Sequence, residues 1–376
     1  MRIVIAPDSF KESMSAPRAA AAMARGVRAV LPRAQVVEVP MSDGGEGFTR
    51  AVAACLGAQI RRVETIDALG RPTIGQMMAV AGTTAVMEMA TCCGLELIAP
   101  EERDILGSDT RGVGRLIRAA LDAGARRILL GIGGSATNDG GAGMLTELGL
   151  GLLGPGGRRI GPAPRDLAAL ERIDASGLDA RLASVSIEVA YDVDNPLLGP
   201  RGASAVFGPQ KGAGSEQVAR LDEVLATWVR VSGHPDLAQR AGAGAAGGLG
   251  FALMALLGAR LVPGVELVAR TVGLEGLIAG ADLVLTGEGS VDAQTLAGKT
   301  PAGVARIARA RGVPAVVLAG RVGAGADALL EAGCLAVVSI SQGDTTSLAQ
   351  ALEAAETSAE RAAASVMRLW VHRPPC

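Results

Sequence analysis

Apolar runs alternate with helical stretches along this chain, and the alternation changes character in the middle. At the N-terminus, residues 2–7 (RIVIAP) are predicted as a buried strand, 15–31 as an amphipathic helix, 34–41 as a second strand and about 47–56 as a second helix. The same alternation of strand and helix occurs near the C-terminus. Strands are predicted there over 282–288, 314–320 and 335–341, and helices over 301–312, 325–333 and 347–370. The two ends together predict a five-stranded, doubly wound parallel sheet.

The middle of the chain predicts a second domain. Residues 61–90 alternate and turn at LGRP like an antiparallel meander. A helix over 108–124, a strand over 126–134, a glycine-rich helix start and a strand over 186–193 follow. The fold class is therefore α/β: a flavodoxin-like discontinuous domain, residues 1–60 plus 276–376, with a second α/β domain, residues 61–275, inserted into it.

The topology predicts where a ligand binds. If the outer sheet has the order 2-1-3-4-5, its switch point lies between the first and third strands, and ligands bind at such a crevice. The loops PDSFKES, MSDGGEGF and TGEGSVD leave the first three strands at that edge. Their polar residues, expected to face one cleft, are Asp8, Lys11, Asp43, Glu46, Glu288 and Asp292.

Composition narrows the class of protein. A net charge of -2 without charge blocks argues against nucleic-acid or anionic-membrane partners, and 49% apolar residues argue against disorder. Five cysteines without C-x-x-C spacing suggest neither a disulfide framework nor a zinc site. No signal peptide or membrane-length apolar run is recognisable. We expect a cytoplasmic protein with small-molecule partners, a monomer or homodimer.

Lysine is rare, and each lysine lies in a glycine-containing stretch. The chain has three, Lys11, Lys211 and Lys299, whereas 33 of its 36 basic residues are arginine. Because arginine supplies almost every other positive charge of the chain, a position that has lysine can be one that requires a compact ammonium group. The three lysines are candidate phosphate contacts; chance and surface placement is the alternative.

Lys299 also ends a near match to a nucleotide-binding loop. Gly298, Lys299 and Thr300 match the end of G-x-x-x-x-G-K-[ST], but the first glycine is replaced by Ala293. The predicted strand ends near Glu288, several residues too early. We therefore expect the stretch to line the cleft without wrapping a triphosphate.

Two further glycine-rich stretches are candidate ligand-binding loops. GIGGSATNDGGAGM (131–144) follows a strand and opens a helix, so backbone amides with Ser135, Thr137 and Asn138 could hold an anion or nucleotide phosphate; a structural turn is the alternative. GAGAAGG (242–248) fits a dinucleotide fingerprint but follows no strand. Close backbone packing and a pocket-shaping loop are equally compatible with it.

Hard oxygen ligands follow another predicted strand. YDVDNPLLG places Asp192, Asp194 and Asn195 after residues 186–191, and such oxygens suit Mg²⁺ bound together with phosphates. An Asx-turn is the alternative. His234 and His372 have no recognisable triad partners, whereas phosphoryl transfer can use an aspartate base with Lys, Arg and Mg²⁺.

Six blocks, in order, resemble the signatures of bacterial glycerate kinases of the glycerate-2-kinase family: APDSFKESMSA, PMSDGGEGF, GIGGSATNDGGAGM, DVDNPLLGPRGASAVFGPQKGA, GAGAAGGLGF and TGEGSVDAQTLAGKTPAGVA. The resemblance implies ATP-dependent, Mg²⁺-assisted phosphorylation of D-glycerate, most often to 2-phosphoglycerate. The family usually has Gly where this chain has Glu12, and Ala where it has Ser42. An acid beside Lys11 weakens the case for anion binding there.

From the loops we derive a hypothesis in which glycerate binds between the domains and Asp43 or Asp192 orients or deprotonates its hydroxyl. The candidate catalytic residues are Lys11, Asp43, Asp192 and Lys299, and the candidate metal ligands are Asp192 and Glu288. The candidate substrate- or nucleotide-binding residues are Asp8, Ser9, Glu46, Gly133, Gly134, Ser135, Asn138, Asp139, Lys211 and Asp292. Three alternatives remain: a glycerate 3-kinase, an NAD(P)-dependent hydroxy-acid oxidoreductase, and a non-catalytic metabolite-binding regulator.

Overall fold

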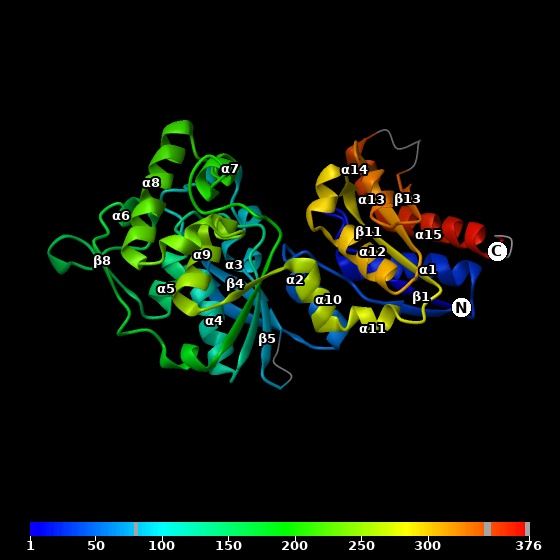
Figure 1. The fold of residues 1–376 in the computed structure, drawn as a ribbon, viewed down its shortest axis with the longest axis horizontal. Coiled ribbons are helices and arrows are strands. Elements are labelled where there is room, and N and C mark those ends of the chain that lie inside the picture. Colours follow the sequence, from blue (N-terminus) through cyan, green and yellow to red (C-terminus); the bar gives the residue numbers. More distant parts are fainter. Residues whose placement is uncertain (79–81, 342–346, 373–376) are drawn as a thin grey trace. The chain divides into compact units, whose positions relative to one another are not determined.

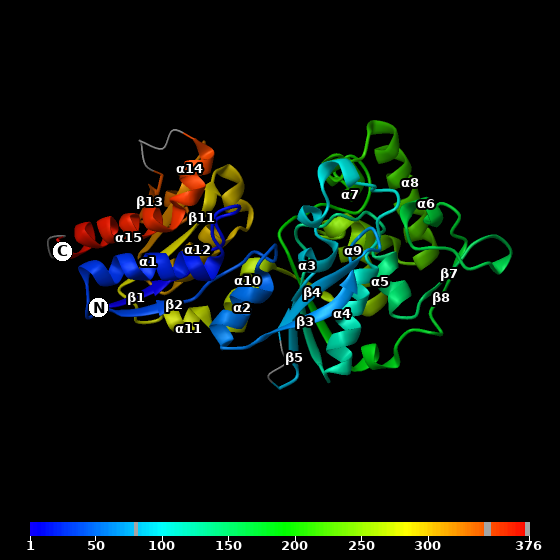
Figure 2. The ribbon, with the colours of Figure 1, turned by 180° about the vertical axis from the view of Figure 1, so that it is seen from behind.

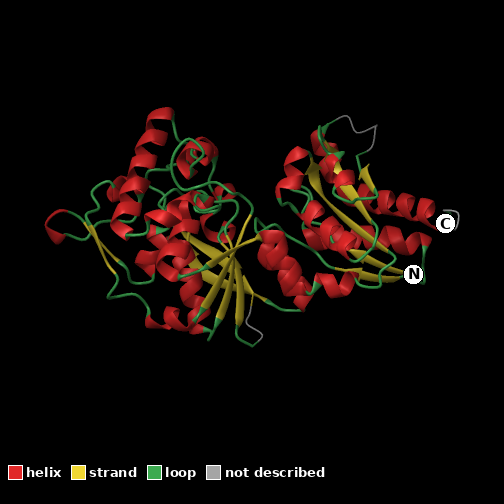
Figure 3. Ribbon diagram, in the orientation of Figure 1, coloured by secondary structure: helices red, strands yellow, loops and turns green. Residues whose placement is uncertain are grey.

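The structure is a computed structural model that describes residues 1–78, 82–341 and 347–372. Within it the chain forms two compact units of mixed helix and strand (Figure 3). Unit 1 comprises Met1–Asp43, Arg50–Gly57 and Pro263–Cys376, and unit 2 comprises Gly44–Thr49 and Ala58–Val262. Among the described helices, none combines the length and the apolar character needed to cross a membrane.

Unit 1 is built on a parallel five-stranded sheet in the order β13-β12-β11-β1-β2 (Figure 1). Its strands are β1 (Arg2–Ile5), β2 (Gln35–Glu38), β11 (Leu283–Val291), β12 (Ala315–Val322) and β13 (Ala336–Ser339). Ile3 of β1 pairs with Val36 on one side and Leu283 on the other. This is the order 2-1-3-4-5 on which the expected position of the ligand depended, so the switch point lies between β1 and β11.

Helices cover this sheet. They are α1 (Ala16–Val30), α2 (Phe48–Leu56), α10 (Gly264–Val272), α11 (Leu274–Ile278), η7 (Ala293–Ala297), α12 (Thr300–Ala310), α13 (Ala328–Glu331), α14 (Leu348–Glu353) and α15 (Ala355–Val371). The alanine-rich α1 and α15 lie side by side, which both views show (Figures 1 and 2), and Ala19, Ala20 and Ala363 are buried in their shared core. The single helix predicted over 347–370 is divided at Ala354.

Unit 2 contains a six-stranded sheet in the order β10-β9-β6-β5-β4-β3. Its strands are β3 (Ile60–Ile66), β4 (Pro72–Met78), β5 (Thr84–Glu88), β6 (Arg127–Gly131), β9 (Ser186–Tyr191) and β10 (Arg260–Pro263). β3, β4 and β5 pair antiparallel, which confirms the meander except for residues 79–81, outside the described part. β5, β6 and β9 pair in parallel, so their carboxyl ends share one edge.

The remaining elements of unit 2 surround this sheet. The α-helices are α3 (Ala90–Cys93), α4 (Arg111–Asp122), α5 (Ala142–Glu147), α6 (Pro164–Leu167), α7 (Ala203–Phe207), α8 (Ser215–Ser232) and α9 (Ala245–Leu257). The 3₁₀ turns are η1 (Leu95–Leu97), η2 (Pro100–Glu102), η3 (Pro155–Gly157), η4 (Ala180–Ser184), η5 (Pro209–Lys211) and η6 (Pro235–Gln239). A small hairpin, β7 (Gly151–Leu153) with β8 (Arg172–Asp174), was not predicted because three-residue strands give little periodicity.

The unit boundaries differ from the predicted domain boundaries. The chain returns to unit 1 at Pro263, whereas the prediction has the second domain continue to residue 275. The reason is local packing: α10 and α11 contact α12 of unit 1. Gly44–Thr49 groups with unit 2 instead of with the first domain, because its backbone packs on β6 and its carboxyl-end loop.

Candidate active site

A buried aspartate lies at the switch point of unit 1. Asp8 follows β1 and is 6% exposed, and its backbone N–H donates to the carbonyl oxygen of Gly287 in β11 at 2.8 Å. One carboxylate oxygen accepts from the N–H of Ser9 at 2.6 Å, and the other accepts from the hydroxyl of Thr300, the first residue of α12. Asp8 therefore joins the loop after β1 to β11 and α12, which lie near the other end of the chain.

The surroundings of Asp8 favour its protonated form. Burial raises the pKa of its carboxyl group to about 8, and the nearby negative charges of Asp43 and, more weakly, Glu288 act in the same direction. The hydrogen bonds from Thr300 and Ser9 oppose the shift. A carboxyl group that exchanges its proton near neutral pH is typical of functional sites.

A second buried carboxyl group comes from β11. Glu288 is 8% exposed and accepts from the hydroxyl of Thr295 at 2.9 Å. Burial raises its pKa to about 7, against the opposing charge of Lys299 and the Thr295 hydrogen bond; Asp43 and Asp292 add smaller raising effects. The predicted acids Asp8, Asp43, Glu288 and Asp292 and the predicted Lys299 thus act on one another electrostatically within unit 1.

The lysine-containing loop after β1 is a tight turn. Phe10 and Met14 form an isolated antiparallel bridge, and Lys11 between them is exposed. Glu12 adopts φ +65°, the left-handed conformation that favours glycine. The backbone at position 12 therefore suits glycine better than the glutamate that this chain has there.

The strand before Lys299 is longer than the sequence predicted. β11 does not end near Glu288 but continues to Val291, because its second half pairs with β12 through Ser290 and Val291. The turn that follows is the 3₁₀ segment η7, and Lys299 occupies the N-cap position of α12. The stretch therefore has the strand–loop–helix order of a phosphate-binding loop, with a helical turn where that motif has an open loop.

In unit 2, the glycine-rich stretch after β6 holds its own carboxylate. Asp139 is fully buried, and its carboxylate accepts from the N–H groups of Gly141 and Gly143 and from the N–H and hydroxyl of Thr110, at 2.7–3.1 Å. Burial, with Asp109, raises its pKa to about 6 against these hydrogen bonds. The amides of Gly141 and Gly143, which we expected to hold a phosphate at the start of α5, thus donate to Asp139, and a ligand contact of Asp139 itself stays a prediction.

Lys211, another predicted anion contact, is buried beneath the same stretch. It is 2% exposed, and its Nζ donates to the Ser135 hydroxyl oxygen and to the Thr137 carbonyl oxygen, both at 2.7 Å. Burial lowers its pKa to about 7, and Asp139 opposes this shift. Asn138, fully buried, donates through Nδ2 to the Ser204 hydroxyl at 3.0 Å.

The stretch packs closely against the SDGGEG loop. The N–H of Gly133 donates to the carbonyl oxygen of Gly44 at 3.2 Å, and a Cβ at Gly133 would lie 2.7 Å from the Cα of Gly45. Only glycine permits this approach. Gly134 and Glu46, both predicted to bind ligand, are exposed beside this contact.

Sequence reasoning missed Glu88, the last residue of β5. It is 2% exposed, and its two carboxylate oxygens accept from the N–H groups of Gly47 at 3.1 Å and Thr49 at 2.8 Å. These two charge-assisted hydrogen bonds hold the segment Gly44–Thr49 in unit 2. The available signal was a lone glutamate at the end of an apolar strand.

Asp192 follows β9 at the same sheet edge and is exposed. It belongs to unit 2, whereas Glu288, the other predicted metal ligand, belongs to unit 1. Within the described residues, no group of three or more His, Cys, Asp or Glu side chains is arranged to hold a metal ion. An ion held by one or two carboxylates together with phosphate oxygens, the usual mode of Mg²⁺, is compatible with the unit 1 acids.

The glycine loop over residues 242–248 packs against the stretch after β6. The N–H of Gly140 donates to the carbonyl oxygen of Gly247 at 3.0 Å, and a Cβ at Gly247 would lie 2.0 Å from the carbonyl oxygen of Thr137. Among the described elements, the one before the loop is the 3₁₀ turn η6 and not a strand, and α9 begins within the loop at Ala245. Of the two interpretations, the geometry supports close backbone packing.

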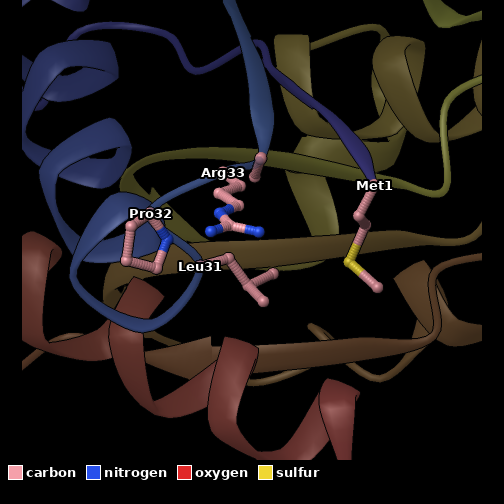
Figure 4. A pocket seen from close by; sticks show the side chains of 5 residues that line it. Met1, Leu31, Pro32 and Arg33 are labelled. Atoms are coloured by element: carbon pink, nitrogen blue, oxygen red, sulfur yellow. The ribbon is translucent and has the colours of Figure 1, made fainter.

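A surface pocket of about 350 Å³ lies elsewhere in unit 1. Met1, Leu31, Pro32, Arg33 and Ala34 line it (Figure 4). These residues precede β1 and β2, so the pocket is at the amino ends of the strands. Because the polar cluster lies at the carboxyl ends, the pocket is separate from the candidate site.

The chain belongs to the glycerate kinase family, a class of phosphotransferase enzymes. The family model described as "Glycerate kinase family" matches residues 3–371. The six blocks from which we inferred the resemblance lie within that range, so the resemblance is confirmed.

Individual relatives of the chain are also named as glycerate kinases. The chain is 46% identical to a glycerate kinase of Bacillus subtilis (strain 168), with 97% of each chain covered, and 47% identical to a glycerate 2-kinase of Escherichia coli (strain K12), with 85% of each covered. A crystal structure from Salmonella typhimurium LT2, described as a candidate glycerate kinase 2, matches with a TM-score of 0.88 and 44% identity over 99% of this chain and 98% of that one.

Proposed function

We propose that this protein transfers the γ-phosphoryl group of ATP to D-glycerate and forms 2-phosphoglycerate. The observation that carries the proposal is the cluster of Asp8, Glu288 and Lys299 at the switch point of a flavodoxin-like sheet, where two carboxyl groups have raised pKa values beside an ammonium group. Such groups suit a reaction that depends on charge neutralisation and one proton transfer. The name of the Escherichia coli relative supports the 2-position.

In the proposed reaction the C2 hydroxyl oxygen bonds to the γ-phosphorus, the bond from phosphorus to the bridging oxygen breaks, and ADP leaves. Asp43 accepts the hydroxyl proton; its charge raises the pKa of both Asp8 and Glu288, which places it near both. Lys299 neutralises charge on the transferred group. Mg²⁺ would be held by Asp8 and Glu288 with phosphate oxygens, and it would neutralise the polyphosphate.

The remaining predicted roles stay predictions: Asp192 as base or metal ligand, Lys11 as phosphate contact, Ser9, Glu46 and Asp292 as ligand contacts, and a site between the domains. The comparisons lend no support to an oxidoreductase or to a regulator without catalysis, since the family is one of kinases. A 3-kinase differs only in the product.

Phosphorus NMR of the product from ATP, Mg²⁺ and D-glycerate tests the proposal directly. We expect the 2-phosphate resonance together with ADP. A 3-phosphate resonance would reassign the position, and ATP left unconsumed would refute the kinase proposal itself.

The site assignment needs variants. Asp8→Asn is expected to lower kcat/KM by roughly 100-fold or more, and Lys299→Met to lower kcat by roughly 100–1,000-fold. Asp327→Asn is the matched control because Asp327 is an exposed aspartate of unit 1. Asp8→Asn activity equal to that of the control would remove Asp8 from the mechanism.

A further inference from the structure

The contact between Lys211 and Ser135 in unit 2 has a chemical consequence beyond packing. Lys211 is 2% exposed and Ser135 is 7% exposed, and the two side chains meet at 2.7 Å under a glycine-rich loop. An ammonium group is costly to bury without a carboxylate partner. The direct partners that the structure gives Lys211 are two neutral oxygens, of Ser135 and Thr137.

The protonation state of Lys211 determines what the Ser135 hydroxyl can do. A protonated Nζ can only donate, so the Ser135 oxygen accepts and its hydrogen remains available to another acceptor. A neutral Nζ has a lone pair, so the same hydroxyl can donate back to the amine. The loop therefore presents a hydroxyl donor, backed by a positive charge, when Lys211 is protonated.

We propose that Lys211 is a positioning residue that directs the Ser135 hydroxyl toward an anionic group of a substrate, either the carboxylate of the hydroxy acid or a nucleotide phosphate. The inference rests on the proposed function, because it assumes that one of these substrates binds at this loop. Lys211 itself touches no ligand. Binding of the anion favours the protonated amine, so binding takes up a proton.

The charged groups around Lys211 are consistent with this linkage. Burial lowers its pKa to about 7, so roughly three quarters of the amine is neutral at pH 7.5. Asp139 is the charge that opposes the shift, and its own pKa is about 6. The Arg103 guanidinium donates to the carbonyl oxygen of Gln210, one residue before Lys211. Measurements at pH 7–8.5 therefore report the titration of Lys211, because Asp139 is already mostly ionised in this range.

Isothermal titration calorimetry at pH 7.5, in two buffers of different ionisation enthalpy, measures the proton uptake. D-glycerate and Mg-ADP are titrated separately into the wild type and into Lys211→Met, which removes the charge; the difference cancels the ionisation of the ligand. We expect up to roughly 0.7 proton taken up with one of the two ligands in the wild type and not in the variant. The ligand that shows the difference identifies the anion.

The pH dependence of the dissociation constant is the second readout. Between pH 6.5 and 8.5 the ratio of the wild-type Kd to the Lys211→Met Kd, in which the ionisation of the ligand and of Asp8 and Glu288 cancels, should rise by up to roughly 25-fold. Ser135→Ala should weaken binding roughly tenfold or more, and Ser135→Thr, which keeps the hydroxyl, should restore it. Gln210→Met, an exposed neighbour, is the control.

A merely structural Lys211 would lower stability without these effects. Wild-type binding of both ligands without proton uptake, or a pH dependence unchanged in the variant, overturns the proposal. If Lys211→Met does not fold, Ser135→Ala takes its place in the comparison with the wild type, because loss of the hydroxyl should also remove the proton uptake linked to Lys211. Kinase activity with no uptake refutes this inference alone, whereas absence of activity refutes the proposed function.

Discussion

Replacing Glu12 by glycine should stabilise unit 1, because Glu12 is a non-glycine residue with φ +65°. A left-handed conformation costs a residue with a Cβ roughly 1–2 kcal/mol, which glycine avoids. Glycine in turn lowers the free energy of unfolding by roughly 0.5–1 kcal/mol, because a glycine residue has more conformational freedom in the unfolded state than a residue with a Cβ. The net expectation is a gain of about 1 kcal/mol in the free energy of unfolding.

The two tryptophans allow this change to be assigned to one unit. Trp370 belongs to unit 1 and Trp228 to unit 2. Urea unfolding followed by fluorescence in a Trp228→Phe background reports unit 1, and in a Trp370→Phe background it reports unit 2. We expect the gain only in the Trp370 signal, since Glu12 lies in unit 1.

Glu12→Ala is the matched control, because it removes the carboxylate but keeps a Cβ in the left-handed region. If the strain argument is right, Glu12→Ala changes stability little and Glu12→Gly exceeds it by about 1 kcal/mol. Equal effects of the two variants would mean that the charge of Glu12, and not its backbone conformation, determines the result.

Three further predictions concern unit 2 and use the Trp228 signal. Glu88→Gln should lower the free energy of unfolding by about 1–3 kcal/mol because it weakens the bonds from Gly47 and Thr49; the exposed Glu101→Gln is the control, and an equal effect would contradict the assignment. Gly133→Ala should destabilise by about 1–3 kcal/mol because its Cβ would lie 2.7 Å from the Cα of Gly45. The control is Gly214→Ala, also in unit 2, whose Cβ would lie 3.8 Å from the nearest atom; a neutral Gly133→Ala would refute the close approach. The raised pKa of Asp139, about 6, means that the folded state binds more protons than the unfolded state between about pH 4 and 6. Stability should therefore fall by up to about 3 kcal/mol as pH rises through this window, and Asp139→Asn, whose urea curves should lack that slope, tests it.

Much of the fold follows from local patterns. The parallel strands of unit 1 are short apolar runs separated by amphipathic helices, and the meander alternates with a turn at LGRP, so both were predictable. The three-residue strands β7 and β8 were not, because so few residues show no period. The continuation of β11 to Val291 was missed because its second half is polar and is held by pairing with β12.

The candidate site was predicted less completely. Loop position after a strand placed Asp8, Glu288 and the stretch after β6 at the carboxyl edges of their sheets, since strand ends in a parallel sheet share one edge; their roles in binding or catalysis stay predictions. The position of a residue in such a loop did not show whether its side chain binds a ligand or another part of the protein. Asp139 and Lys211 looked like ligand contacts in sequence, yet the structure buries both within the loop.

The sequence by itself determined the family and the fold class, because these follow from periodicity, from spacing and from six signature blocks, whereas the sheet order 2-1-3-4-5 was assumed as a common one and is given by the structure. Only the tertiary structure decided which polar groups are partners, because Asp8 with Thr300 and Lys211 with Ser135 lie 292 and 76 residues apart along the chain. Burial and neighbouring charges, which shift the pKa values of these groups, arise only when distant segments pack together.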